Sequence, residues 1–528
     1  MINKILNIKI LQIILLLGSG GITLITFAPL NIWWLIFPIM FIWIFVVNYN
    51  YTVSYSPRLI LKTVFINSYI FGFGFFFANL YWTYVSLHEV INLNAPISVL
   101  LHILFALFLA SYVGLAAVFY RLLKINHKSQ KIQIVNLMFL IPTCWVLCEI
   151  LRGKLFTGFS WYNISYIAMN IHCLHGFFPL GGEYLVSWIF LSIIAGSYIL
   201  INMLLNSQIS HQALLRIRDK KYAVIIVLYI FFIILFGHAL SKIQYTVVEN
   251  KTVKLALIQG NNSVTEKWNF EYFHGLLNKY AQMVAASKSA DIIIMPETAI
   301  SVFPSKLPDN YLDDLIRLAN NSQVIIGMPM PLDHSGESYS NAAILLNNFT
   351  YYTKQHLVPY GEYIPLKSVL GSFYQNIALP MVNFQADASH NQTVNVQNIK
   401  LAFNLCYENG FGEELITTGK VSQIMVNLSD MVWYKDTWAK DHHLQMSIAR
   451  TLENQRYWVQ DTNSGLTAII DPQGQIVAQL PANVQDILFY SVPLVHGSTP
   501  YQRIGDNLIN LLLIINLLAF LLLRYLTK

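Results

Sequence analysis

Long apolar runs are the feature that most constrains the fold of this chain. A helix needs about 20 apolar residues to cross a bilayer. Runs close to that length cover residues 8–28, 31–48, 60–82, 97–120, 134–151, 184–204, 222–241 and 507–525. Charged residues make up only 11% of the chain, whereas a soluble domain has about 25%. The sequence therefore predicts a membrane bundle of eight transmembrane helices.

Basic residues in the loops predict the orientation of this bundle, because Lys and Arg concentrate in cytoplasmic loops. The second, fourth and sixth loops carry Arg58, Lys62, Arg121, Lys124, Lys128, Lys131, Arg216, Arg218, Lys220 and Lys221. The third loop has no Lys or Arg, and the fifth carries two basic residues against the trend, Arg152 and Lys154. The pattern predicts cytoplasmic termini and an opposite location for the region between the last two spans.

Three domains follow from these spans. We expect a membrane bundle over 1–244, an extramembrane domain over 245–505 and a closing span over 506–528. In the middle region, short β-rich runs alternate with helical patterns, which is typical of a buried α/β sheet. Strands are predicted at 253–259, 291–296, 323–329, 342–352, 399–406, 422–428, 457–462 and 466–471. Helices are predicted at 268–288, 309–320 and 438–456.

Two segments have both an ordinary and a functional interpretation. The loop from Arg152 to Trp161 mixes charge, glycine and aromatic residues. It is either an interfacial aromatic belt with a snorkelling arginine or a floor for a lipid headgroup, with Arg152 pairing with phosphate. Residues 366–384 are apolar but interrupted by Gly371 and Pro380. They form either a core-packed insertion or a lid that dips into the outer leaflet and gates lipid access.

Three reactive side chains follow predicted strands. Cys406 ends one apolar run, Glu297 follows another, and Lys354 lies just after a third. Each alone is usually unremarkable: a buried thiol, a solvated acid or a surface amine. Together they indicate covalent acyl chemistry, because nucleophiles in α/β sheets gather at strand ends. A thiolate attacks, a buried Glu accepts its proton, and a Lys with the backbone N–H of Tyr407 stabilises the oxyanion.

Other functions receive less support from the residues. The net charge of +6 is too modest to predict nucleic-acid binding. The four cysteines have no metal-ligand spacing, and we expect neither a metal nor a cofactor. His442 and His443 fall on a predicted helix without further ligand spacing, so we expect them to be surface residues.

Several motifs together resemble a known family. The resemblance rests on Asn79-Leu80-Tyr81-Trp82, the Arg152–Trp161 loop, Gln259-Gly260-Asn261 with Trp268, Pro296-Glu297-Thr298-Ala299-Ile300, Lys354 through Pro365, Cys406-Tyr407-Glu408 and Asn427-Leu428-Ser429-Asp430 with Trp433. They are similar to the nitrilase superfamily, with its Glu–Lys–Cys triad on an α-β-β-α sandwich. The closer resemblance is to its membrane-embedded branch, the apolipoprotein N-acyltransferases, over nearly the whole chain.

The resemblance implies a role for each matching residue. Glu297 is then the general base, Lys354 the oxyanion stabiliser and Cys406 the nucleophile. Supporting acids are Glu362 and Glu408. Residues near the substrate are Trp268, Tyr407 and Trp433, to which we add Arg152 from the fifth loop. One departure is Asn409-Gly410-Phe411, where more aliphatic residues are expected.

The resemblance also implies a reaction and a location. The family works by a ping-pong mechanism in the bacterial inner membrane, with its catalytic domain in the periplasm. Cys406 takes an acyl chain from a phospholipid, and the α-amine of a diacylglyceryl-cysteine on an apolipoprotein accepts it. We expect a monomer embedded in the bilayer.

Two alternatives remain open from the sequence. A membrane-tethered amidase or nitrilase acting on small amides would keep the triad and use the spans only as anchors. A non-catalytic binding module or a transporter would leave the triad without a task and offers few intramembrane charges for a transport path, Glu149 being the main candidate.

Overall fold

The computed structural model describes residues 9–49, 56–127, 129–209, 217–333, 336–364, 384–387, 389 and 393–526. Apart from Phe384, the predicted lid at 366–384 lies outside the described residues. The described residues form two compact units. One comprises Met1–Tyr84, Ala95–Ile243 and Ile504–Lys528, and the other comprises Val85–Asn94 and Gln244–Arg503.

The first unit is helical, and its long helices are apolar. Its main elements are α2 (Lys9–Ile22), α3 (Ile36–Asn48), α4 (Pro57–Asn79), α6 (Ala95–Leu123), α8 (Ile141–Lys154), α10 (Phe178–Ile209), α11 (Ile217–Leu240) and α19 (Asn507–Leu526). Seven helices within the described residues are long and apolar enough to cross a membrane. The second predicted span, 31–48, corresponds to a shorter apolar helix, Trp33–Asn48. The chain is therefore a multi-pass membrane protein, and the predicted count of eight spans is not confirmed.

Close helix packing in this unit depends on small residues. A Cβ atom added to Gly20 would overlap the carbonyl oxygen of Phe71 on α4, and one added to Gly74 would overlap the carbonyl oxygen of Leu17 on α2. Glycine at facing positions lets two helix backbones approach closely within a membrane, where packing replaces the hydrophobic effect as the driving force.

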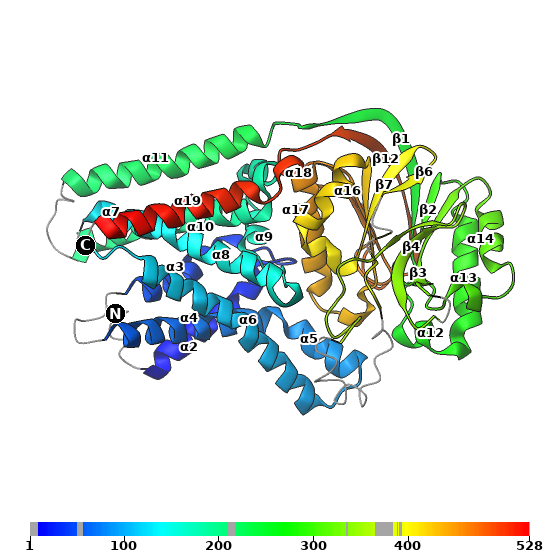
Figure 1. Cartoon of the computed structure of the whole chain (residues 1–528), viewed down its shortest axis with the longest axis horizontal. Helices are drawn as coiled ribbons and strands as arrows, with labels where there is room; N and C mark the ends of the chain where they lie inside the picture. Colours follow the sequence, from blue (N-terminus) through cyan, green and yellow to red (C-terminus); the bar gives the residue numbers. More distant parts are fainter. Residues whose placement is uncertain are drawn as a thin grey trace. The chain divides into compact units, whose positions relative to one another are not determined.

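The second unit is a sandwich of two sheets between helices, as predicted. Within the described residues, one six-stranded sheet has the order β12-β1-β2-β3-β4-β5 and the other has the order β11-β10-β9-β8-β7-β6. Figure 1 shows α13 (Phe273–Ala286) and α14 (Tyr311–Ala319) outside the first sheet, and α16 (Ile416–Val421) and α17 (Ala439–Asn454) outside the second. This is the α-β-β-α arrangement that the resemblance implied.

The predicted strands of this unit are found, with one correction. The first sheet contains β1 (Thr246–Gln259), β2 (Ile292–Ile294), β3 (Gln323–Pro331), β4 (Tyr339–Leu345), β5 (Thr350–Thr353) and β12 (Asp486–Gly497). The second contains β6 (Val394–Val396), β7 (Ile399–Leu405), β8 (Ile424–Ser429), β9 (Trp458–Thr462), β10 (Ala468–Ile470) and β11 (Ile476–Gln479). The single strand predicted at 342–352 is wrong. The chain turns there, with Phe349 at a φ of 59°, and β4 and β5 pair antiparallel.

Apolar side chains fill the space between the sheets. Leu257 and Ile294 from the first sheet meet Phe403, Val426 and others from the second in one buried cluster. A further cluster joins the first sheet to α13 and α14. The parallel strands β1, β2 and β3, and β7, β8 and β9, point the same way within their sheets. Loops that follow the ends of such strands collect at one edge, and the candidate site lies there.

Candidate active site

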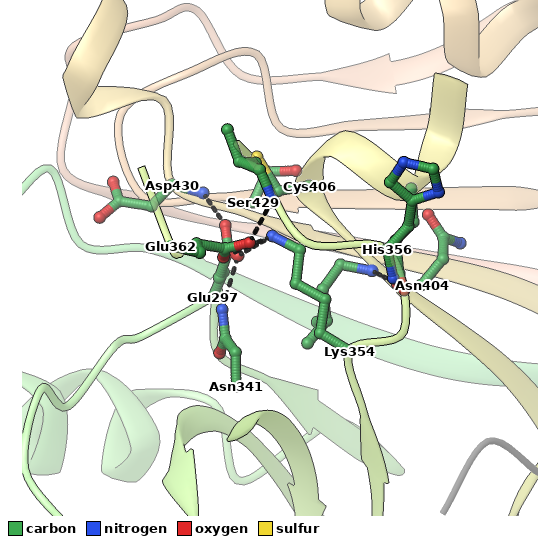
Figure 2. Close-up of polar contacts among 12 residues, drawn as sticks. Glu297, Asn341, Lys354, His356, Glu362, Asn404, Cys406, Ser429 and Asp430 are labelled. Carbon is green, nitrogen blue, oxygen red and sulfur yellow. Dashed lines mark hydrogen bonds and ion pairs between the residues drawn. The ribbon is translucent and has the colours of Figure 1, made fainter. Parts of the chain in front are cut away.

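Glu297 lies in the loop that follows β2. Its Oε1 atom accepts hydrogen bonds from Asn341 Nδ2 at 2.7 Å and from Lys354 Nζ at 3.2 Å, and its Oε2 atom accepts one from the backbone N–H of Asp430 at 2.9 Å. Figure 2 shows these donors converging on the carboxylate from separate segments. Gly327 on β3 makes room for this loop, because an added Cβ atom would lie 2.7 Å from the Cα atom of Glu297.

Lys354 directly follows β5, and its side chain is only 1% exposed. Its Nζ atom lies 3.2 Å from Glu297 Oε1 and 2.7 Å from Glu362 Oε1, and dashed lines in Figure 2 mark both contacts. Burial by itself lowers the pKa of this amine, but Glu297 and Glu362 together raise the pKa well above its ordinary value. The ammonium group therefore stays charged, compensated by two carboxylates.

Cys406 follows β7 as the first residue of η10 (Cys406–Gly410). Its φ of 49° lies in the left-handed region, which non-glycine residues adopt rarely and often at functional sites. Burial, and then the negative charge of Glu297, raises the pKa of its thiol well above the ordinary value, while Lys354 lowers it. The thiol is thus neutral at rest, and its proton leaves only when a base accepts it.

Burial also raises the pKa of Glu297, as do the nearby carboxylates of Glu362 and Asp430, while Lys354 and the backbone N–H of Asp430 lower it. A carboxylate with a raised pKa is a stronger base than a solvated one. The site therefore holds a neutral thiol, a basic carboxylate and a permanent cation within one buried group of residues, which can perform nucleophilic acyl chemistry.

The two predicted supporting acids occupy different places. Glu362 accepts from Lys354 through Oε1 and from the backbone N–H of Val358 through Oε2, at 2.8 Å. Glu408 accepts from the N–H groups of Gln355, His356 and Leu405 and from the hydroxyl of Tyr352 at distances of 2.7, 3.0, 2.6 and 2.8 Å. Glu408 thus ties the segment after Lys354 to the end of β7, directly before Cys406.

Replacing Glu408 by glutamine is expected to destabilise the protein by about 1–3 kcal/mol, because an amide NH₂ then faces a buried backbone N–H that has lost its acceptor. The midpoint of thermal unfolding in detergent measures the effect. Glu414→Gln is the matched control. Its carboxylate is half-exposed beside His356, and the change should cost less than about 0.5 kcal/mol. Equal, small shifts in both variants would contradict a structural role for Glu408.

The predicted substrate-binding residues have varied surroundings. Tyr407 is buried beside Phe411, with ring centroids 5.1 Å apart. Trp268 ends α12 (Val264–Trp268) and is half-buried. Trp433 is also half-buried, and its carbonyl accepts a hydrogen bond from Ser86 Oγ at 2.7 Å. These contacts leave their predicted role in substrate binding untested.

Arg152 belongs to the helical unit and is buried there. Its guanidinium group donates to the carbonyl of Trp161 and, at 2.6 Å, to Asn163 Oδ1, and it lies over the ring of Phe76. Arg152 therefore helps to hold the 152–161 loop in place. Its pairing with a lipid phosphate stays a prediction.

Sequence reasoning assigned no role to several residues around the triad. Asn341 and the backbone of Asp430 both hold Glu297. Lys267 is buried and contacts Asp430 Oδ2 at 2.5 Å. Tyr434 is half-buried near Cys406 and Lys354, and burial raises the pKa of its hydroxyl well above the ordinary value. The sequence did point to Asn341, since a polar residue next to a buried apolar strand segment needs a hydrogen-bond partner.

One prediction about the site region is wrong. His442 and His443 were expected on the surface, but both are buried on α17. The helix packs against the second sheet and against the turn that carries Cys406, so 14 residues from Ala439 to Asn454 are buried, polar ones included. The helical pattern alone did not reveal that polar residues of this helix face the interior.

Comparisons with known proteins agree with this architecture. Residues 19–196 match the model of the apolipoprotein N-acyltransferase N-terminal domain, and residues 254–498 match the carbon-nitrogen hydrolase model. An apolipoprotein N-acyltransferase of Chromobacterium violaceum is 32% identical over 503 residues, covering 94% of this chain and 91% of its own length. One from Neisseria meningitidis serogroup B is 32% identical, covering 93% and 92%. One from Coxiella burnetii is 30% identical, covering 96% and 99%. The chain therefore belongs to the apolipoprotein N-acyltransferase family.

Proposed function

We propose that this protein transfers a fatty acyl chain from a phospholipid, through a thioester on Cys406, to the α-amino group of the N-terminal diacylglyceryl-cysteine of an apolipoprotein. The observation that carries the proposal is the buried group of Glu297, Lys354 and Cys406 in a multi-pass chain whose full-length relatives are named apolipoprotein N-acyltransferases. Anchoring alone does not require so many membrane helices. An enzyme that takes its acyl donor from the bilayer has a use for them.

In the first half-reaction, Glu297 takes the thiol proton while the sulfur atom of Cys406 attacks the ester carbonyl carbon of the phospholipid. Lys354 and the backbone N–H of Tyr407 stabilise the oxyanion that forms. The oxyanion collapses, the ester C–O bond breaks, and protonated Glu297 returns its proton to the leaving oxygen. The products are a lysophospholipid and the acyl thioester.

In the second half-reaction, the amine of the diacylated cysteine attacks the thioester carbonyl carbon, and Glu297 accepts the amine proton. The C–S bond breaks, the amide is formed, and the proton returns to the sulfur atom of Cys406. A thioester reacts readily with amines, and exclusion of water from the site protects it from hydrolysis.

We further propose that residues 245–505 work on the periplasmic side of a bacterial inner membrane, with both termini in the cytoplasm, and that the protein acts as a monomer. The distribution of Lys and Arg among the loops supports the orientation. The half-buried Trp268 and Trp433 are proposed to contact the substrates.

Replacing Glu362 by glutamine is expected to move the acid limb of the pH–rate profile to lower pH. The carboxylate of Glu297 must be ionised to act as a base, and the like charge of Glu362 raises its pKa. Removing that charge favours ionised Glu297, so activity persists to lower pH. The rate of Cys406 acylation between pH 4 and 8 measures the shift. An acid limb that stays in place or moves upward would rule out Glu297 as the titrating base.

The proposed function is tested with a phospholipid whose acyl chain is deuterated and a diacylglyceryl-cysteine peptide as acceptor. The peptide should gain one deuterated acyl group on its α-amine, with one lysophospholipid formed for each peptide. The alternative, a tethered amidase, would instead release ammonia from small amides at a steady rate and leave the peptide unchanged. That pair of results would overturn the proposal.

A further inference from the structure

The carbonyl oxygen of Cys406 is held by two side chains from different elements. His443 on α17 places its Nε2 atom 3.2 Å from this oxygen. Asn427 on β8 donates to it from Nδ2 at 3.3 Å. Both side chains are buried. Because a carbonyl oxygen only accepts hydrogen bonds, the Nε2 atom of His443 carries the proton.

The same peptide unit that carries this carbonyl carries the N–H of Tyr407. A peptide unit is planar and trans, so its C=O and N–H point in opposite directions. Whatever fixes the direction of the carbonyl therefore fixes the direction of the N–H. The left-handed φ of Cys406 is a costly conformation for a residue with a side chain, so this unit needs partners that hold it in place.

We infer that His443 is a positioning residue which, together with Asn427, fixes the peptide unit between Cys406 and Tyr407 and so aims the Tyr407 N–H at the oxyanion. The inference rests on the proposed function, since the oxyanion arises only when Cys406 attacks a carbonyl. It gives a task to a histidine that is otherwise unexplained.

A reciprocal contact fixes α17 relative to the turn of Cys406. Asn409 on η10 donates from Nδ2 to the carbonyl of His443 at 3.1 Å and to Ser447 Oγ at 3.0 Å. The helix thus holds the turn through His443, and the turn holds the helix through Asn409. This accounts for an asparagine at a position where the family resemblance led us to expect an aliphatic residue.

The electrostatic surroundings separate positioning from proton transfer. Burial, with a smaller contribution from the positive charge of Lys354, lowers the pKa of His443 to about 4, although the hydrogen bond to the Cys406 carbonyl acts in the opposite direction. The imidazole is therefore neutral near pH 7, and its one proton is donated to a backbone oxygen. His443 therefore acts by orienting the peptide unit between Cys406 and Tyr407, whereas Glu297 transfers the proton.

The experiment compares His443→Gln with His443→Asn in the full-length protein. The glutamine amide reaches about as far as Nε2 and can donate to the carbonyl, whereas the asparagine amide is one methylene shorter and cannot. Two rates are measured on Cys406: acylation by phospholipid in a single turnover, which passes through an oxyanion, and alkylation by iodoacetamide, which does not. His442→Gln, the same change one residue away, controls for loss of an imidazole from this helix.

We expect His443→Asn to slow acylation about tenfold or more, because an aimed oxyanion donor is worth about 10²–10³ in rate. Alkylation should stay within about threefold, and His443→Gln should recover most of the acylation rate. Parallel losses of acylation and alkylation would mean a merely structural role and overturn the inference, as would unchanged acylation in His443→Asn. A failure of the proposed function is distinguishable, because the unsubstituted protein would then show alkylation but no acylation.

Discussion

Replacing Cys406 by serine is expected to abolish acyl transfer, by at least about 10³-fold, as losses of catalytic nucleophiles do. A serine hydroxyl is far less acidic than a thiol, so Glu297 cannot generate the attacking anion. The change is small in volume and lies in the sandwich unit rather than in the long apolar helices, so the variant should still insert into membranes. The measurement is the yield of N-acylated diacylglyceryl-cysteine peptide together with the membrane-bound amount of protein.

Cys173→Ser is the matched control for this prediction. Cys173 is a half-buried thiol of the helical unit, and its replacement should leave acyl transfer within about twofold, as for most substitutions away from a site. Full acylation by the Cys406→Ser protein would show that another group is the nucleophile and would end the proposed mechanism.

Replacing Lys354 by methionine should have the second-largest effect. The change removes the cation but keeps an unbranched side chain only one atom shorter, and it leaves the carboxylates of Glu297 and Glu362 buried without their counterion. Losing one partner of a buried ion pair costs about 3–5 kcal/mol, and losing an oxyanion donor costs about 10²–10³ in rate.

The direction of the pH effect makes this prediction specific. Lys354 lowers the pKa of Glu297 and of Cys406, so its loss raises both. The acid limb of the residual acylation rate should therefore move to higher pH, opposite to the shift expected for Glu362→Gln. A limb that moves downward, or that does not move, would contradict the assigned charges.

Lys435→Met provides the control for stability. Lys435 Nζ also lies 3.2 Å from a carboxylate oxygen, that of Glu89, but its side chain is 46% exposed. Exposed ion pairs are worth about 0–1 kcal/mol, so the thermal midpoint should change little. Similar destabilisation by both lysine substitutions would mean that the buried ion pairs of Lys354 contribute no more to stability than the exposed pair of Lys435.

Much of the fold could be predicted because strong local patterns specify it. Apolar runs of membrane length gave the helices of the first unit, and buried runs such as Ile292–Ile294 gave the strands of the second. Weak patterns were missed. β11 (Ile476–Gln479) lies at a sheet edge and is largely exposed, so it lacks a continuous apolar run. β4 and β5 were merged because the turn between them, at Asn347 and Asn348, is short.

The site shows the same division between local and long-range information. Glu297, Lys354 and Cys406 each follow a strand, so the sequence pointed to their meeting at one edge. Asn341 and His443 act through contacts between elements far apart in the chain, 44 residues from Glu297 and 37 from Cys406. Such partners depend on how the strands are ordered and how α17 packs, which no local pattern encodes.

The central claim is that Cys406 carries an acyl chain. Its most direct test is peptide mass mapping of the purified protein after incubation with a phospholipid of known acyl composition and without acceptor. The account predicts one acyl group on the peptide that contains Cys406, removed by neutral hydroxylamine as a thioester is, and lost when the diacylglyceryl-cysteine peptide is added. An unmodified Cys406 in protein that still acylates the acceptor peptide would contradict it.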